Sequence, residues 1–132
     1  MKNSRDQSPE NIVDHWVEHF NNGNLERLLD MYHEEATLLP TFSPNLLSTP
    51  EQIEEYFVRT IEHQASVEID DGRTIKKKLS ENMYLMTGFY IFYLDNDRKR
   101  KFKSQFTFLI DLTTERPIQH HHSSQIITER LL

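Results

Sequence analysis

The sequence predicts an α+β fold, with helices in the first half of the chain and strands in the second. Before residue 65, apolar residues recur at helical spacing in three short stretches, with one short strand among them. From residue 65 onward the pattern changes to the alternation and turn signals of β-strands. Because the two patterns are segregated along the chain and do not alternate, an antiparallel sheet covered by helices is expected.

The first two helices are predicted from their ends. Ser8 is placed as an N-cap with Pro9 at the first helical position, and Gly23 can adopt the left-handed conformation that ends this helix. Asn24 then caps a second, short helix, whose expected apolar stripe runs over 25–32 and includes Tyr32.

A short strand and a third helix complete the first half of the chain. Residues 36–39 are apolar or β-branched and stop at a proline, which predicts a short strand. Thr49 precedes a proline and is followed three residues later by Gln52, an arrangement that predicts a capping box. The apolar stripe of this helix extends to Ile61.

Five strands are expected in the second half of the chain. Gly88 interrupts the longest of them and predicts a bulge or bend. The predicted strands span residues 66–70, 73–79, 83–94, 98–112 and 118–127.

Both faces of the long strands are apolar. Phe89 and Ile91 alternate with Tyr90 and Phe92, where a sheet with one solvated face would show polar residues. Three helices can cover only one face, so we expect the other to pack against a second copy of the chain in a homodimer.

Composition limits the class of protein. The 132 residues predict a single domain over 9–128, with a disordered tail at 1–8 and a short tail at 129–132. A net charge of −6 argues against nucleic-acid binding, and the basic runs 76–78 and 98–101 are expected to be solvated. No cysteine, secretory signal or membrane span is present, so a cytoplasmic protein is expected.

Local motifs carry a family resemblance. They are Leu38-Leu39-Pro40-Thr41 with Ser43 and Thr49-Pro50, Tyr56-Phe57, Gly88-Phe89-Tyr90, Phe106-Thr107-Phe108 and His120-His121-His122-Ser123-Ser124. With the order of elements, they resemble the nuclear transport factor 2-like superfamily, a cone of three helices on a curved, mostly antiparallel sheet. More narrowly, they resemble free-standing relatives of the calcium/calmodulin-dependent protein kinase II association domain.

The sequence departs from that family at two positions. Gln105 stands where relatives usually carry a pocket arginine, and Thr114-Glu115-Arg116 replaces a Gly-x-Trp turn. The resemblance implies that Arg73, in a strand where relatives also carry arginine, would be needed for an anionic ligand.

Pairing of the last two strands divides their side chains between two faces. If the hairpin turns around Thr114, Gln105 lies opposite Ser123 and Thr107 lies opposite His121. This register predicts a polar face with Gln105, Thr107, Gln119, His121 and Ser123. It predicts an apolar face with Phe106, Phe108, Ile110, Ile118, His120 and His122.

The resemblance and this pairing together predict the lining of a ligand pocket. His121 is a candidate general base and Tyr90 a candidate electrophile, should the protein be an enzyme. The expected pocket residues are Tyr32, Tyr56, Arg73, Tyr90, Gln105, Thr107, His121 and Ser123.

Two pairs of histidines have spacings that are also found in metal sites. His120 and His122 lie about 6.5–7 Å apart on one face of a strand, a spacing that suits two zinc ligands. No third ligand is evident, so we expect them to be core or dimer histidines and expect no metal or cofactor. His15 and His19 are four residues apart on a helix, but the residue after His15 is not the glutamate of a zinc protease, so both are expected on the surface.

Three functions are compatible with these patterns. The first is a self-associating module that binds an unidentified small molecule without chemistry of its own. The second is a pocket enzyme of the isomerase, dehydratase or polyketide-cyclase kind that uses a cavity histidine. The third is a protein-interaction module.

Overall fold

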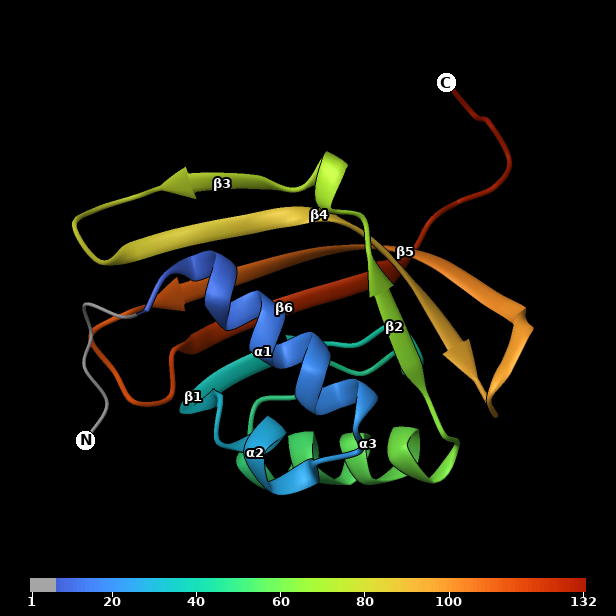
Figure 1. Ribbon diagram of the computed structural model, residues 1–132, viewed down its shortest axis with the longest axis horizontal. Coiled ribbons are helices and arrows are strands. Elements are labelled where there is room, and N and C mark those ends of the chain that lie inside the picture. The colour runs from blue at the N-terminus through green and yellow to red at the C-terminus, as the bar shows by residue number, and fades with distance from the viewer. Residues whose placement is uncertain (1–6) are drawn as a thin grey trace.

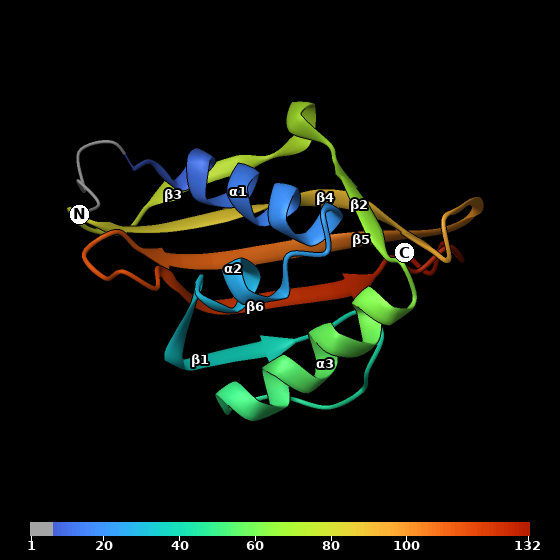
Figure 2. The ribbon, with the colours of Figure 1, turned by 60° about the horizontal axis from the view of Figure 1, so that its bottom comes forward.

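The computed structural model describes residues 7–132 and shows a curved six-stranded sheet with the helices on one of its faces (Figures 1 and 2). The helices are α1 (Pro9–Asn21), α2 (Leu25–Leu29) and α3 (Pro50–Glu62), with a 3-10 turn, η2, at Asp71–Arg73. The strands are β1 (Tyr32–Leu39), β2 (Ser66–Ile69), β3 (Ile75–Lys78), β4 (Met83–Leu94), β5 (Asp97–Asp111) and β6 (Ile118–Gln125). The predicted α+β class is confirmed. The predicted N-terminal tail lies mostly outside the described residues.

Helix ends follow the local signals of the sequence. The Ser8 side chain accepts a hydrogen bond from the Asn11 N–H, and Asn24 caps α2 in the same way. Thr49 and Gln52 form the full capping box at the start of α3. Gly23 has φ +64°, the left-handed conformation that glycine adopts without strain.

The strand order is β1-β6-β5-β4-β2, and β3 also pairs with β4. Only the β1–β6 pair is parallel among the described strands. The long strands β4 and β5 form the centre of the sheet. Strands β2 and β3 pair with the same edge of β4, at different positions along its length (Figure 1).

The core lies between the sheet and the helices. Trp16 of α1 stacks on Phe20 and on Tyr90 and meets Phe108 edge-on, so one indole ring joins the helix to two strands. On the sheet, every second residue faces this core, including Tyr90, Phe92, Phe106, Phe108 and Ile110, all at most 4% exposed. We call this the inner face and the side without helices the outer face.

Three details of the predicted chain path were wrong. Tyr32 does not belong to α2, which ends at Leu29; it begins β1, which is four residues longer than predicted. Of the bulge or bend predicted at Gly88, the bulge is absent, because the pairing of Gly88 with Phe106 continues the regular ladder. Its missing side chain instead allows close approach of the backbone, since a Cβ there would lie 2.9 Å from the Arg73 carbonyl oxygen.

The predicted register of the last hairpin was wrong by one residue over most of its length. Ile110 pairs with Ile118 as the turn around Thr114 requires, but beyond it Leu109 pairs with His120. Gln119 is therefore an extra, bulged residue, and its side-chain amide donates to the Arg116 and Pro117 carbonyls. A local bulge of this kind reverses the predicted sorting of side chains on β5.

Candidate functional site

A chain of buried hydrogen bonds crosses the inner face from α1 to the loop after β1. The Trp16 Nε1–H donates to the Tyr32 hydroxyl over 2.9 Å, and that oxygen lies 2.8 Å from His121 Nδ1. The other ring nitrogen, His121 Nε2, lies 3.1 Å from the Tyr90 hydroxyl. Tyr90 donates to Ser123, whose hydroxyl meets that of Thr41. We call these six residues the buried relay.

The direction of each hydrogen bond follows from the indole, which can only donate. Tyr32 accepts from Trp16, so its own proton goes to His121 Nδ1. The imidazole is then neutral with its proton on Nε2, which donates to Tyr90. Every hydroxyl in the middle of the relay thus accepts one bond and donates one.

Burial sets the ionisation of the relay. His121 is 2% exposed, and the Phe108 ring stacks on it at a centroid distance of 4.0 Å. This burial holds the pKa of His121 well below its ordinary value, and the charges of His120 and His122 add to the effect. Burial likewise raises the pKa values of Tyr32 and Tyr90 well above that of an exposed tyrosine. All members are neutral around pH 7.

The histidines flanking His121 lie on the outer face. His120 Nδ1 is hydrogen-bonded to the Thr37 hydroxyl of β1, and burial lowers the pKa of His120. His122 pairs with Thr107 and is half-buried. Alternation along β6 therefore puts His121 inside and its two neighbours outside, as the sequence predicted for β6 itself.

The structure brings together only part of the predicted pocket. Tyr32, Tyr90, His121 and Ser123 meet in the buried relay, whereas Gln105 and Thr107 lie on the outer face. Their predicted pairing with Ser123 and His121 was wrong, because the bulge at Gln119 pairs them with Ser124 and His122 instead.

Arg73 also lies away from the buried relay. It belongs to η2 rather than to a strand, and its guanidinium carbon lies 3.8 Å from the centre of the Phe89 ring on the outer face. Its side chain is 61% exposed and lies 3.9 Å from the Asp70 carboxylate. An anion held by Arg73 would therefore not contact His121.

The predicted residue Tyr56 lines a separate pocket beside α3. The pocket has a volume of about 770 Å³ and lies between the loop after β1, α3 and the β4–β5 tip. Phe42 packs edge-on against Phe92 and Phe102 at its inner side, and the Phe42 N–H donates to the Tyr56 hydroxyl. Its lining comprises Phe42, Ser43, Pro44, Asn45, Leu46, Leu47, Gln52, Glu55, Tyr56, Arg59, Thr60, His63, Leu94 and Arg100. We call it the loop pocket.

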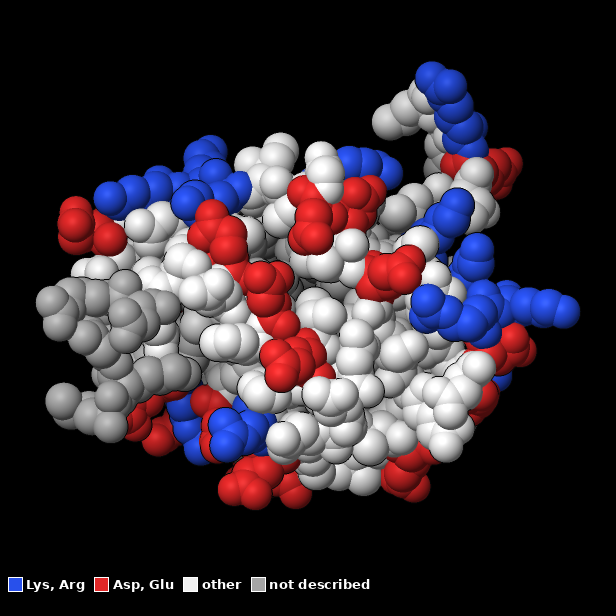
Figure 3. All heavy atoms as spheres, in the orientation of Figure 1, with Lys and Arg blue, Asp and Glu red and all other residues white. Residues whose placement is uncertain are grey.

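Several charged groups elsewhere form ion pairs on the surface. Figure 3 shows Lys and Arg gathered in separate groups, one near β3 and another near the β4–β5 tip. Lys76 contacts Glu10 at 2.9 Å and Arg98 contacts Glu68 at 3.3 Å.

Over residues 7–132, no group of three or more His, Asp or Glu side chains is arranged to hold a metal ion. In the same range, no helix is long and apolar enough to cross a membrane.

Two members of the buried relay were not predicted as site residues. Trp16 was assigned only to an apolar helix stripe, and Thr41 only to a loop motif. Trp16 could have been suspected, because a buried indole N–H requires an acceptor and Tyr32 was already a candidate. Thr41 offers no such signal, since its contact with Ser123 spans 82 residues of chain.

Comparison with solved structures defines the class of protein. A putative calcium/calmodulin dependent protein kinase II association domain from Xanthomonas campestris is 24% identical, with a TM-score of 0.79 over 98% of this chain and 95% of that one. An NTF2-like protein of unknown function from Pseudomonas putida KT2440 is 7% identical, with a TM-score of 0.76 over 92% of each chain. The fold is therefore nuclear transport factor 2-like, as the sequence predicted.

The same fold is shared with a putative scytalone dehydratase from Novosphingobium aromaticivorans, at 10% identity and a TM-score of 0.73 over 89% of this chain and 81% of that one. No curated protein sequence matches this chain. The family model of the calcium/calmodulin dependent protein kinase II association domain matches residues 5–126. The chain belongs to that family, which confirms the predicted resemblance.

Proposed function

We propose that this protein is a self-associating module in which the outer faces of two sheets pack against each other. The observation that carries this proposal is the outer face itself, which no described helix covers (Figure 2). Leu85 and Leu109 are paired there on adjacent strands and are half-buried by their neighbours alone. Membership in an association-domain family, whose name implies oligomerisation, supports the same conclusion.

Side chains on the outer face suit a protein interface more than a solvated sheet. Leu39, His122, Thr107 and Thr87 follow one another across four paired strands, from β1 to β4. Phe89 and Ile91 continue the apolar surface along β4. Aromatic and aliphatic groups with small hydroxyls and imidazoles are typical of an interface core. Charged side chains also lie on this face, among them Lys77, which pairs with Leu85, and Lys103, which pairs with Ile91.

Light scattering coupled to size exclusion tests the proposal. We expect a dimer or larger assembly at micromolar concentration, and a monomer with unchanged circular dichroism for Leu109→Asp. Leu46→Asp is the matched control, since Leu46 is 57% exposed on the loop after β1 and away from the outer face. A monomeric wild type, or equal weakening by both variants, would overturn the proposal.

The loop pocket supports a second function, the binding of a small amphipathic molecule. Its apolar wall, with Phe42 and Leu94, adjoins Arg59 and Arg100, so an apolar body with a polar end fits its chemistry. Binding of the dye 1-anilinonaphthalene-8-sulfonate tests this function. Leu46→Asp should weaken dye binding in the loop pocket and leave the assembly intact. Leu109→Asp should break the assembly and leave dye binding in the loop pocket intact. No dye binding by the wild type would refute this function.

The geometry of His121 does not favour the enzyme alternative. Both of its ring nitrogens already have a tyrosine partner, and Phe108 covers one face of the ring. A substrate would have to displace Tyr32 or Tyr90 before it could exchange a proton with the imidazole. The buried relay is better explained as a structural network that joins α1, β1, β4 and β6.

A further inference from the structure

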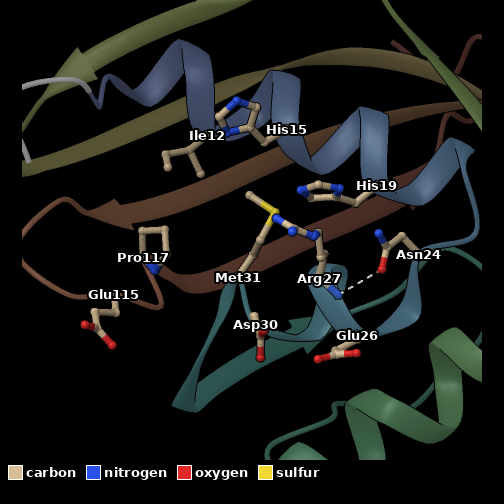
Figure 4. A pocket seen from close by; sticks show the side chains of 10 residues that line it. All are labelled: Ile12, His15, His19, Asn24, Glu26, Arg27, Asp30, Met31, Glu115 and Pro117. Carbon is tan, nitrogen blue, oxygen red and sulfur yellow. Dashed lines mark hydrogen bonds between the residues drawn. The ribbon is translucent and has the colours of Figure 1, made fainter. Parts of the chain in front are cut away.

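A second pocket, remote from the loop pocket, opens between α1, α2 and the turn before β6 (Figure 4). It has a volume of about 510 Å³. Ile12, Met31 and Pro117 are buried residues at its base, and the rest of its lining is polar or charged. The full lining is Ile12, His15, His19, Asn24, Glu26, Arg27, Asp30, Met31, Glu115 and Pro117.

Three hydrogen-bond donors face this pocket from two helices. His15 and His19 are one turn apart on α1, with ring centroids separated by 6.3 Å. Arg27 extends from α2 toward α1, so that its guanidinium lies on the same side of the pocket as the two imidazoles (Figure 4).

The guanidinium of Arg27 has no carboxylate partner within residues 7–132, although Glu26 precedes it and Asp30 follows one turn later. Asp30 instead contacts Arg116 at 3.2 Å. Five other arginines each contact a carboxylate: Arg59 with Glu55, Arg73 with Asp70, Arg98 with Glu68, Arg100 with Asp95, and Arg116 with Asp30. Arg27 thus presents an uncompensated cation to the pocket.

The carboxylates of the pocket lie on its opposite side. In Figure 4 the Glu26, Asp30 and Glu115 side chains point away from His15, His19 and Arg27. The pocket is therefore polarised, with donors on the side of α1 and acceptors on α2, at its C-cap and in the turn before β6. Such an arrangement suits a ligand that carries an anionic group at one end and hydroxyl groups at the other.

We propose that this pocket binds a small phosphorylated molecule, with its phosphate held by Arg27, His15 and His19. A guanidinium offers two parallel N–H donors to phosphate oxygens, and each imidazole offers one more. Glu26 and Glu115 would accept hydrogen bonds from hydroxyl groups on the remainder of the ligand. The volume exceeds that of a phosphate ion alone, which favours a phosphomonoester of a small polyol or sugar.

The neighbouring charges favour an anion over a metal ion. Two histidines one turn apart can chelate zinc, but the Arg27 cation on the same side of the pocket opposes a divalent cation. Over residues 7–132, no third His, Asp or Glu joins them in a group able to hold a metal ion.

Titration of the full chain with ribose 5-phosphate and with inorganic phosphate, followed by NMR, tests the proposal. We expect saturable shifts of the His15 and His19 ring resonances, with tighter binding of ribose 5-phosphate because the acidic side of the pocket contacts its hydroxyls. Arg27→Gln should weaken binding by about tenfold or more, the loss expected for a charge-assisted bidentate contact. Arg98→Gln, at an exposed arginine of β5 that lines neither pocket, is the matched control and should leave the affinity unchanged.

Three results would overturn the proposal. They are the absence of saturable shifts with either probe at millimolar concentration, equal effects of Arg27→Gln and Arg98→Gln, and zinc binding that Arg27→Gln does not weaken while phosphate binding is absent. None of these results bears on self-association or on the loop pocket. Circular dichroism of Arg27→Gln should match the wild type, because the exposed guanidinium makes no described contact that supports the fold.

Discussion

The inner and outer faces of the sheet carry similar residue types, but these side chains find their hydrogen-bond partners and their apolar cover in different ways. On the inner face, the polar groups of Tyr90, His121 and Ser123 are enclosed by aromatic rings and bonded to one another. On the outer face, His122 and Thr107 lie beside half-buried apolar side chains, and no described helix covers them. Over the described residues, each buried side-chain nitrogen or oxygen has a partner. The inner face is complete within one chain, whereas in the proposed assembly a second chain would complete the outer face.

The largest expected difference between the two faces is in the effect of removing a ring. Phe108→Ala empties a position that is 0% exposed and should lower the free energy of unfolding by about 3–5 kcal/mol. Phe89→Ala, on the half-buried outer face, should cost the monomer about 1 kcal/mol or less. Urea denaturation at low protein concentration measures both. Equal costs would contradict the distinction between the faces.

Removing one hydroxyl from the buried relay has the next largest effect. Tyr90→Phe leaves the His121 Nε2–H without an acceptor and removes the donor to Ser123, which should cost about 1–3 kcal/mol. Tyr84→Phe is the control, because the Tyr84 hydroxyl makes no described hydrogen bond. A Tyr90→Phe variant as stable as its control would show that the relay contributes nothing to stability.

Acid should destabilise the folded protein through the buried histidine of the inner face. Below about pH 6.5, His121 of the unfolded chain binds a proton. His121 of the folded chain does not, because burial lowers its pKa. The free energy of unfolding should therefore fall with decreasing pH, by about 1.4 kcal/mol per pH unit for this group. Burial also lowers the pKa of His120, which adds a loss of the same sign. Denaturation at several pH values should show a smaller slope for His121→Asn; an unchanged slope would contradict this origin.

A hydrogen bond on the outer face should matter least. Thr37→Val removes the hydroxyl bonded to His120 at a half-buried position where water can replace it. We expect a cost of about 0.5–1 kcal/mol, below that of Tyr90→Phe. A greater loss than that of Tyr90→Phe would reverse the comparison.

Signals confined to a few neighbouring residues could be interpreted from the sequence. The caps at Ser8, Asn24 and Thr49 depend on side chains within one helical turn, and all three were predicted correctly. Tyr32 was misplaced because its position also fits the apolar stripe of α2. Helical spacing alone does not show where a helix stops when the next strand is also apolar.

The candidate site depended on contacts that no local pattern encodes. The bulge at Gln119 changes the partner of every later residue of β6, and the turn residues around Thr114 gave no sign of it. His121 was still placed on the inner face, because alternation along β6 survives the bulge. Its partners Trp16 and Tyr32 come from elements 105 and 89 positions away, so their convergence required the fold.

Nitrogen-15 NMR of the histidine rings tests the difference between the two faces most directly. At neutral pH, His121 should show the neutral tautomer with its proton on Nε2, and its shifts should not change when the protein is diluted. His122 should change on dilution as the outer face becomes exposed to water. A His121 signal that changes on dilution, or a His122 signal that does not, would contradict a sealed inner face and an associating outer face.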